Sequence, residues 1–315
     1  MKIKFLKLKV VYKKILITGS NGLVGSTLVR YLKESDYNVI PSTRKDTNLF
    51  SFEETKILIN NTKPDLIINC AAKVGGILAN NTYRSDFILE NLKINMNLLE
   101  ALKEVEPLRF INLGSSCIYP LNAPNPIKEE YIMEGKLEQT NSPYAMAKLT
   151  SIEIGDAISK EYGHNITNLM PTNLYGPGDN FDENNSHVIP GLISRLNKAK
   201  NLNSEYFHVW GTGKPLREFL YSIDFADAVK FIIENKINDN LINVGSGEEV
   251  SIFELVKIIK RIIDFKGELL FDSNKPDGNP RKLLDSSKIN NLGWKPKYDL
   301  EKGIQETYKW YLNTI

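Results

Sequence analysis

Residues that cross-link chains or bind metals are scarce in this 315-residue sequence, which has two cysteines and three histidines. Two cysteines define no disulfide framework, and free thiols are typical of a reducing compartment, so we expect a cytoplasmic protein and no metal ion. A net charge of +2 lacks the basic excess of nucleic-acid-binding proteins. No apolar run is long enough to span a bilayer, and lysines interrupt the apolar residues of MKIKFLKLKVVYKK, so no signal-peptide core forms.

The composition that remains is that of an ordinary globular protein, with 42% hydrophobic and 25% charged residues. Short apolar runs alternate with segments of helical periodicity in the first half of the chain. They predict strands at 14–18, 38–42, 66–70, 109–113 and 165–170, and helices at 22–33, 52–60, 82–105 and 144–162. This alternation predicts right-handed βαβ units and a Rossmann-like, doubly wound parallel sheet of the α/β class.

The pattern loosens after Pro171, where Gly, Asn, Asp and Pro become frequent, and a strand at 240–244 is predicted to return the chain to the sheet. We therefore expect a dinucleotide-binding domain of residues 1–172 and 212–246. Residues 173–211 and 247–315 are expected to form a smaller α/β substrate-binding domain. Residues 1–12 are expected to form a first strand or a frayed tail, the alternative being a basic arm on a membrane surface.

A glycine-rich turn, Gly19-Ser20-Asn21-Gly22-Leu23-Val24-Gly25, lies between the first strand and the first helix. Glycines let the backbone approach a pyrophosphate, and the helix start offers free N–H groups. We expect a dinucleotide to lie against this turn, contacting Gly19, Gly22 and Gly25 and the intervening Asn21, Leu23 and Val24. The alternative is a tight turn that serves helix packing alone.

The second strand ends at Ser42-Thr43-Arg44-Lys45, where a cofactor with a free ribose 2′-hydroxyl usually meets an acidic residue. Arg44 offers a bidentate partner for a 2′-phosphate instead, so the sequence favours NADP(H) over NAD. The alternative is a solvated loop pair, and Asp46 lies nearby.

A candidate catalytic set follows the strand at 109–113, because ligands bind at the carboxyl ends of parallel strands. Ser115 lies just after this strand, and Tyr144 and Lys148 share one helix face. We expect the Lys148 ammonium to lower the pKa of Tyr144, and Ser115 to hold the same substrate oxygen as Tyr144. These groups would polarise a carbonyl and deliver a proton as hydride arrives. The alternative for Tyr144 and Lys148 is an ordinary surface pair.

The order of the glycine turn, Ser115, Tyr144 and Lys148 resembles the extended short-chain dehydrogenase/reductase family. Longer stretches resemble members of that family that act on GDP-4-keto sugars. They are CAAKVGGILANNTY (70–83), GSSCIYP (114–120), PYAMAK (143–148), MPTNLYGPGDNF (170–181), NSHVIP (185–190), REFLY (217–221) and KPDGNPRKLLD (275–285). The resemblance runs from about Lys13 to the C-terminus.

This resemblance implies NADPH-dependent 3,5-epimerisation and 4-reduction of GDP-4-keto-6-deoxy-D-mannose to GDP-L-fucose. It makes Cys117 the base, His187 the acid and Tyr144 the proton donor of the reduction. One alternative is a relative with one or both activities on another GDP-4-keto sugar, such as a GDP-heptose or a dideoxy sugar. A nonenzymatic dinucleotide sensor is a further alternative, but such a protein is expected to lack part of the Ser115, Tyr144 and Lys148 set.

The resemblance also implies further binding residues and a homodimer. For the cofactor these are Leu113, Gly114, Ser115, Lys148, Pro171, Asn173, Leu174 and His187, and for the GDP-sugar Arg195, Trp210, Arg217 and Asp277. The helices at 82–105 and 144–162 are the expected dimer contact. Cys70 is expected to be a packed core residue near a strand end.

Overall fold

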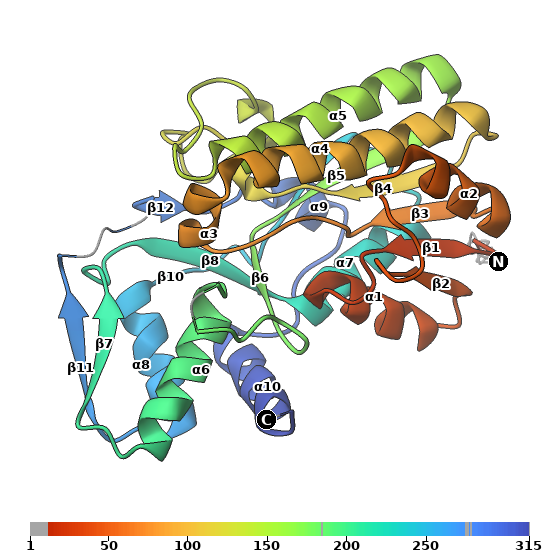
Figure 1. Cartoon of the computed structure of the whole chain (residues 1–315). Coiled ribbons are helices and arrows are strands. Elements are labelled where there is room, and N and C mark those ends of the chain that lie inside the picture. Colours follow the sequence, from red (N-terminus) through yellow and green to blue (C-terminus); the bar gives the residue numbers. More distant parts are fainter. Residues whose placement is uncertain (1–11, 184, 275–276, 278, 315) are drawn as a thin grey trace, which may run out of the picture.

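Six parallel strands form the central sheet of the computed structural model, which describes residues 12–183, 185–274, 277 and 279–314 (Figure 1). The strands are β1 (Ile15–Thr18), β2 (Val39–Ser42), β3 (Leu66–Asn69), β4 (Arg109–Leu113), β5 (Asn165–Pro171) and β9 (Leu241–Val244). Their spatial order is β2-β1-β3-β4-β5-β9, so the strand order reverses between β1 and β3, where such sheets bind ligands. The expected Rossmann-like sheet is confirmed, and residues 1–11, the expected strand or tail, lie outside the described residues.

Helices cover both faces of this sheet (Figure 1). One face carries α2 (Phe52–Thr62), α4 (Arg84–Ala101) and α5 (Ser142–Tyr162), and the other α1 (Leu23–Lys33), α7 (Ser222–Glu234) and α9 (Ser287–Asn291). Strand residues alternate between the faces: Ile15 and Ile17 pack with α1 and α7, whereas Leu16 packs with α2 and α4. Burial on both faces explains why these strands are continuous apolar runs in the sequence.

The rest of the chain builds a second lobe beside the carboxyl edge of the sheet. It contains β6 (Asn173–Tyr175), α6 (Val188–Asn201), β7 (Tyr206–Trp210), β8 (Leu216–Tyr221), β10 (Glu249–Ser251), α8 (Ile252–Ile263), β11 (Glu268–Asp272), β12 (Arg281–Lys282) and α10 (Leu300–Leu312). Strand β8 pairs with β6, β10 and β12, and β7 pairs with β11. The division into domains at residues 172, 212 and 247 stays a prediction.

One long helix expected from the sequence, at 82–105, is divided in the structure. Helix α3 (Ile77–Thr82) ends before Tyr83, α4 begins at Arg84 and ends at Ala101, and a 3₁₀ turn, η1 (Leu102–Glu104), follows. The amide of Asn80 donates to the carbonyls of Gly75 and Gly76 at 2.7 and 3.1 Å, which ties α3 to the loop before it. Tyr83, with φ −107° and ψ 44°, leaves the helical conformation and separates α3 from α4. The helix expected at 144–162 begins two residues earlier, at Ser142, and ends as expected at Tyr162, with Gly163 as its C-cap at φ +76°.

A row of buried polar side chains crosses the sheet near its carboxyl edge. Thr18, Asn69, Asn112 and Asn168 occupy one register on β1, β3, β4 and β5. Thr18 Oγ1 donates to Asn69 Oδ1 at 2.8 Å, Asn69 Nδ2 donates to Asn112 Oδ1 at 3.0 Å, and Asn112 Nδ2 donates to Asn168 Oδ1 at 3.2 Å. We call these four residues the amide row.

The amide row also reaches the helix that carries Tyr144 and Lys148. Asn112 Nδ2 donates to Ser151 Oγ at 3.2 Å, and Ser151 Oγ donates to the carbonyl of Lys148 at 2.7 Å. Because buried polar groups are costly when unpaired, this network favours one position of α5 on the sheet.

Replacing Asn112 with leucine should therefore destabilise the protein, because its amide-row partners and Ser151 would lose hydrogen bonds inside the core. We expect Asn112→Leu to lower the free energy of unfolding by about 1–3 kcal/mol in urea titrations. Asn235→Ala, at an exposed helix end, is the control and should change it by less than about 0.5 kcal/mol. Equal effects of the two variants would contradict the role given to the amide row.

Candidate active site

The glycine turn lies where β1 meets α1, and close packing requires two of its glycines, Gly19 and Gly25. Gly19 has φ +65°, and a Cβ there would lie 2.6 Å from the backbone nitrogen of Ala71. A Cβ on Gly25 would lie 2.2 Å from the carbonyl oxygen of Gly19. Gly22 caps α1 without a side-chain hydrogen bond, and the first turn of α1, which contains Leu23 and Val24, has no acidic residue. This turn therefore fits an anionic pyrophosphate at a helix start.

Arg44 lies exposed just after β2, at the same edge of the sheet as the glycine turn. Its guanidinium stands 6.0 Å from the ring centre of Phe50. The Asp46 carboxylate accepts from Thr43 N at 2.8 Å and from Thr43 Oγ1 at 2.7 Å, and these bonds lower the pKa of Asp46. The nearby acid is thus engaged by Thr43, and the position of Arg44 fits a 2′-phosphate better than a 2′-hydroxyl.

Ser115 and Cys117 lie in the turn that follows β4. Ser115 is extended and caps the short helix η2 (Ser116–Ile118), its hydroxyl accepting from Cys117 N at 3.2 Å. The Cys117 sulfur is half-buried and accepts from Asn141 Nδ2 at 3.3 Å. Gly114, between Ser115 and Leu113, packs against Met170, because a Cβ there would lie 2.0 Å from the Met170 methyl.

Tyr144 projects from the first turn of α5 toward these two residues. Burial raises the pKa of Tyr144, the charge of the Cys117 thiolate raises it further, and a hydrogen bond with Ser115 lowers it. The structure therefore brings the Ser115 hydroxyl, the Cys117 sulfur and the Tyr144 phenol together. The ring of Tyr144 packs edge-on against Phe87 at 6.3 Å between centres, which orients the phenol.

The expectation that Lys148 lowers the pKa of Tyr144 is wrong for this structure. The Lys148 ammonium donates to the carbonyl of Leu113 at 2.7 Å and stands 5.9 Å from the centre of the Tyr144 ring. Burial dominates for both residues, raising the pKa of Tyr144 and lowering that of Lys148 to about 8. Tyr144 is accordingly a protonated phenol at neutral pH, which is the form that donates a proton.

Cys70, the other cysteine, lies just beyond β3 and packs against the core of the sheet as expected. Burial raises the pKa of its thiol to about 12, and the neighbouring charge of Lys148 opposes this rise. Cys70 is thus a protonated thiol beside Lys148 at neutral pH.

His187 caps α6 at the entrance to the second lobe, and its side chain is exposed. Desolvation by the surrounding protein atoms nevertheless lowers the pKa of the His187 imidazole. Gly76 allows this approach, since a Cβ there would lie 2.9 Å from the Ser186 carbonyl, so His187 stands beside the loop that follows β3. Within the part of the chain that the structure describes, no hydrogen bond joins His187 to Cys117 or Tyr144.

The four residues expected at the GDP-sugar form two pairs. The Arg195 guanidinium lies 5.7 and 5.9 Å from the ring centres of Phe207 and Trp210. Arg217 is half-buried, donates to the carbonyls of Leu216 and Asn279, and is close enough to Asp277 and Cys117 for their charges to raise its pKa against the lowering effect of burial. Arg217 and Asp277 therefore lie near Cys117, whereas Arg195 and Trp210 lie on α6 and β7.

The remaining cofactor candidates lie on β5 and β6. Pro171 ends β5, and Asn173 and Leu174 are in β6. Asn173 Nδ2 donates to the main-chain carbonyl of Glu218 at 2.8 Å, so this edge of the sheet is tied to β8, the strand that carries Arg217.

Sequence reasoning missed two residues that support this crevice. The fully buried carboxylate of Glu218 accepts from the backbone N–H groups of Gly247 and Leu284 at 2.8 and 3.0 Å, which fixes β8. The feature of the sequence that could have pointed to Glu218 is an acidic residue inside the largely apolar run LREFLY. Asn141 holds the Cys117 sulfur, and the only signal was an asparagine just before a helix, where it is usual as a cap.

Fold and site together define a dinucleotide-binding oxidoreductase class, with Ser115, Tyr144 and Lys148 beside a glycine turn at the carboxyl edge of a parallel sheet. Residues 15–245 match the NAD dependent epimerase/dehydratase family, and the chain belongs to this family. Among the described residues, no helix is long and apolar enough to cross a membrane, and no group of three or more His, Cys, Asp or Glu is placed to hold a metal ion.

Named relatives resemble the chain over nearly its whole length. It is 44% identical to a GDP-L-fucose synthase of Sinorhizobium fredii over 303 residues, which cover 96% of each chain. A solved GDP-L-fucose synthetase of Naegleria fowleri bound to NADP is 31% identical with a TM-score of 0.88, covering 96% of this chain and 93% of that one. A GDP-6-OMe-4-keto-L-xylo-heptose reductase of C. jejuni is 32% identical with a TM-score of 0.90, covering 97% and 99%.

The pKa of Lys148 predicts an alkaline limit to activity. Since it is lowered to about 8, the ammonium is present below that pH and is lost as the pH rises through it. The ammonium donates to the carbonyl of Leu113 and so holds α5, with Tyr144, against the end of β4. Because a charged donor makes the stronger hydrogen bond, kcat/KM should fall above about pH 8 as this charge is lost. Lys148→Arg keeps a cation at all these pH values. The residual kcat/KM of this variant should therefore not fall above about pH 8. If it falls as in the parent, a group other than Lys148 causes the loss of activity.

Proposed function

We propose that the protein converts GDP-4-keto-6-deoxy-D-mannose to GDP-L-fucose, epimerising C3 and C5 and reducing C4 with NADPH. The observation that carries this proposal is the convergence of the Ser115 hydroxyl, the Cys117 sulfur and the Tyr144 phenol beside Arg217. The 44% identity to a GDP-L-fucose synthase over nearly the whole chain supports the same substrate.

Epimerisation begins with the acidity that a C4 ketone confers on the C3–H and C5–H bonds. The Cys117 sulfur takes the proton from one of these carbons, releases it to solvent, and then takes the proton from the other. Ser115 and Tyr144 hydrogen-bond to the C4 oxygen and stabilise the enolate that forms. Inversion requires a proton from the opposite face of the ring, and His187 is the proposed donor. Because the pKa of His187 is lowered in the unliganded protein, we expect the negative charge of the GDP pyrophosphate to help it take up this proton.

Reduction uses the same oxygen contacts. Bound NADPH would supply the hydride to C4, and Tyr144 would give the C4 oxygen its proton. The raised pKa of Tyr144 keeps the phenol protonated until that moment, and Lys148 holds α5 in place through its bond to the carbonyl of Leu113. One set of side chains therefore serves both steps.

The residues that would hold NADPH lie along one edge of the sheet. The glycine turn and the start of α1 suit the pyrophosphate, and Arg44 suits the 2′-phosphate. Leu113, Gly114 and Pro171, at or next to the ends of β4 and β5, are proposed to line the rest of this path.

For the GDP-sugar, Arg217 is the proposed partner of the pyrophosphate nearest the reacting ring, because it adjoins Cys117. Arg195 provides a second cation, with Trp210 as a flat apolar surface next to it. Asp277 accepts from Thr212 N and Oγ1 at 2.9 and 2.7 Å, which fixes the loop that approaches Arg217.

The function is tested with purified protein, NADPH and GDP-4-keto-6-deoxy-D-mannose. We expect NADPH consumption and, without NADPH in deuterated water, exchange at C3 and C5. Cys117→Ser should slow this exchange at least about 100-fold, since a general base contributes on that order. Turnover of a 4-keto-heptose GDP-sugar but not of the deoxymannose would contradict the proposed substrate and favour the heptose alternative, for which the C. jejuni relative is the precedent.

We also propose a cytoplasmic location, which the free thiols of Cys70 and Cys117 support.

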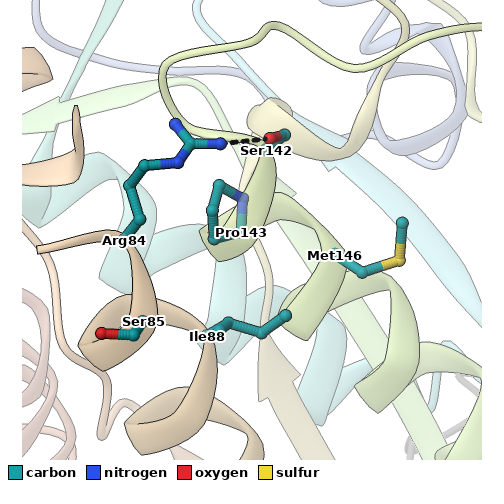
Figure 2. Close-up of a pocket in the computed structure, with 6 residues that line it drawn as sticks. All are labelled: Arg84, Ser85, Ile88, Ser142, Pro143 and Met146. Carbon is teal, nitrogen blue, oxygen red and sulfur yellow. Dashed lines mark hydrogen bonds between the residues drawn. The ribbon is translucent and has the colours of Figure 1, made fainter.

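We propose further that a second copy of the chain covers the outer face of α4 and α5. Large apolar side chains are exposed there, including Leu89, Met96 and Met146. A hollow of about 410 Å³ lies between the starts of the two helices (Figure 2), lined by Arg84, Ser85, Ile88, Ser142, Pro143 and Met146. Exposed apolar surface of this kind is typical of an interface.

The dimer is tested with the double variant Leu89→Glu, Met96→Glu. Light scattering should give the mass of two chains for the parent and of one chain for the variant, because buried unpaired charges disfavour the interface. Ile57→Glu, at an equally exposed apolar position on α2, is the control and should leave the mass unchanged. A monomeric parent would overturn the proposal.

A further inference from the structure

Asn141 stands at the cap position of α5 but does not cap the helix. Asparagine there usually accepts a backbone N–H from the first turn, yet its side chain makes no such bond here. Its amide Nδ2 instead donates to the Cys117 sulfur at 3.3 Å. Its Oδ1 is buried and has no hydrogen-bond partner among the residues that the structure describes. A buried acceptor left unpaired in a crevice indicates a missing donor.

We propose that Asn141 is a positioning residue that holds the Cys117 sulfur with its Nδ2 and accepts a hydroxyl of the substrate sugar on its Oδ1. The second half of this proposal rests on the proposed function. A donor at the sulfur favours the thiolate over the thiol, which is the form that takes a proton from carbon. The sugar hydroxyl would satisfy Oδ1 and place C3 and C5 at a fixed distance from the sulfur.

The turn that carries Asn141 is held from both sides. Glu138 Oε2 accepts from Asn141 N at 3.2 Å, and Glu138 Oε1 accepts from Thr140 N at 3.0 Å. Arg84, on α4, donates to the carbonyl of Gln139 at 2.9 Å and to Ser142 Oγ at 3.2 Å (Figure 2). Asn141 is thus fixed before substrate arrives, as expected of a group that positions a base.

Other charges around the sulfur come from two neighbouring elements. Arg217, on β8, lies close enough to Cys117 for the two groups to interact electrostatically. Tyr144, on α5, is neutral at neutral pH. Asn141 adds a dipole without net charge, so Asn141→Asp reverses its effect while nearly preserving its shape. The carboxylate would repel the thiolate, and it has no N–H to donate.

The first experiment alkylates the full-length protein with iodoacetamide between pH 6 and 10 and measures modification at Cys117 by peptide mass. At about pH 7.5, Asn141→Asp should slow alkylation at least about tenfold, which corresponds to a shift of about one pH unit. Asn141→Ala should slow it less. Ser142→Ala, which alters the same turn without touching the sulfur, should stay within about twofold of the parent.

This measurement needs no sugar substrate, so it decides the contact with Cys117 even if the proposed function fails. If Cys117 is alkylated in both Asn141 variants at the parental rate and with the parental pH dependence, that half of the proposal is overturned. Circular dichroism of each variant shows whether it is folded, and Asn141→Ala carries the test if Asn141→Asp does not fold.

The second experiment measures exchange at C3 and C5 of GDP-4-keto-6-deoxy-D-mannose without NADPH, over a range of substrate concentrations. Asn141→Ala should raise KM about tenfold and also lower the maximal exchange rate, because it loses both contacts. An unchanged KM would remove the sugar hydroxyl from the proposal. A parent that neither exchanges nor reduces this substrate would instead refute the proposed function.

Discussion

A buried ammonium joins the helix that carries the catalytic phenol to the strand that carries the catalytic hydroxyl. Lys148 Nζ donates to the carbonyl of Leu113 at 2.7 Å, at the last residue of β4. One step along the sequence, Asn112 joins the same helix through Ser151. With α5 fixed in this way, Tyr144 faces Ser115 and Cys117, which lie in the turn after β4. The burial that makes this contact strong also lowers the pKa of Lys148.

The second lobe completes the crevice from the other side. The buried Glu218 carboxylate fixes β8, whose main chain also accepts from Asn173 at the edge of the central sheet. The neighbouring Arg217 thereby reaches the charge of Cys117. A base, an oxygen-binding pair and a cation for the nucleotide thus meet at the edge where the two lobes join, which suits a substrate whose sugar must be deprotonated and reduced in one orientation.

Strands buried on both faces could be predicted because their apolar runs are continuous, as in Leu66–Asn69. The glycine turn and the Ser115–Tyr144–Lys148 set could be predicted because local spacing determines them. The break at Tyr83 could not, since Tyr83 leaves the helical conformation without a glycine or proline to signal it. The pKa of Tyr144 could not be predicted either: sequence spacing puts Lys148 nearby, but only the folded packing shows that Tyr144 is buried and that the Lys148 ammonium bonds to Leu113. The role of Asn141 depends on contacts across 24 residues of chain.

The central claim is that one phenol stabilises the C4 oxygen in both epimerisation and reduction. Deuterium exchange at C3 and C5, measured with Tyr144→Phe in the absence of NADPH, tests it most directly. If the same hydroxyl serves both steps, exchange should slow together with reduction, each by at least about tenfold. Exchange at the parental rate in a variant that no longer reduces the ketone would show that the two steps rely on separate groups.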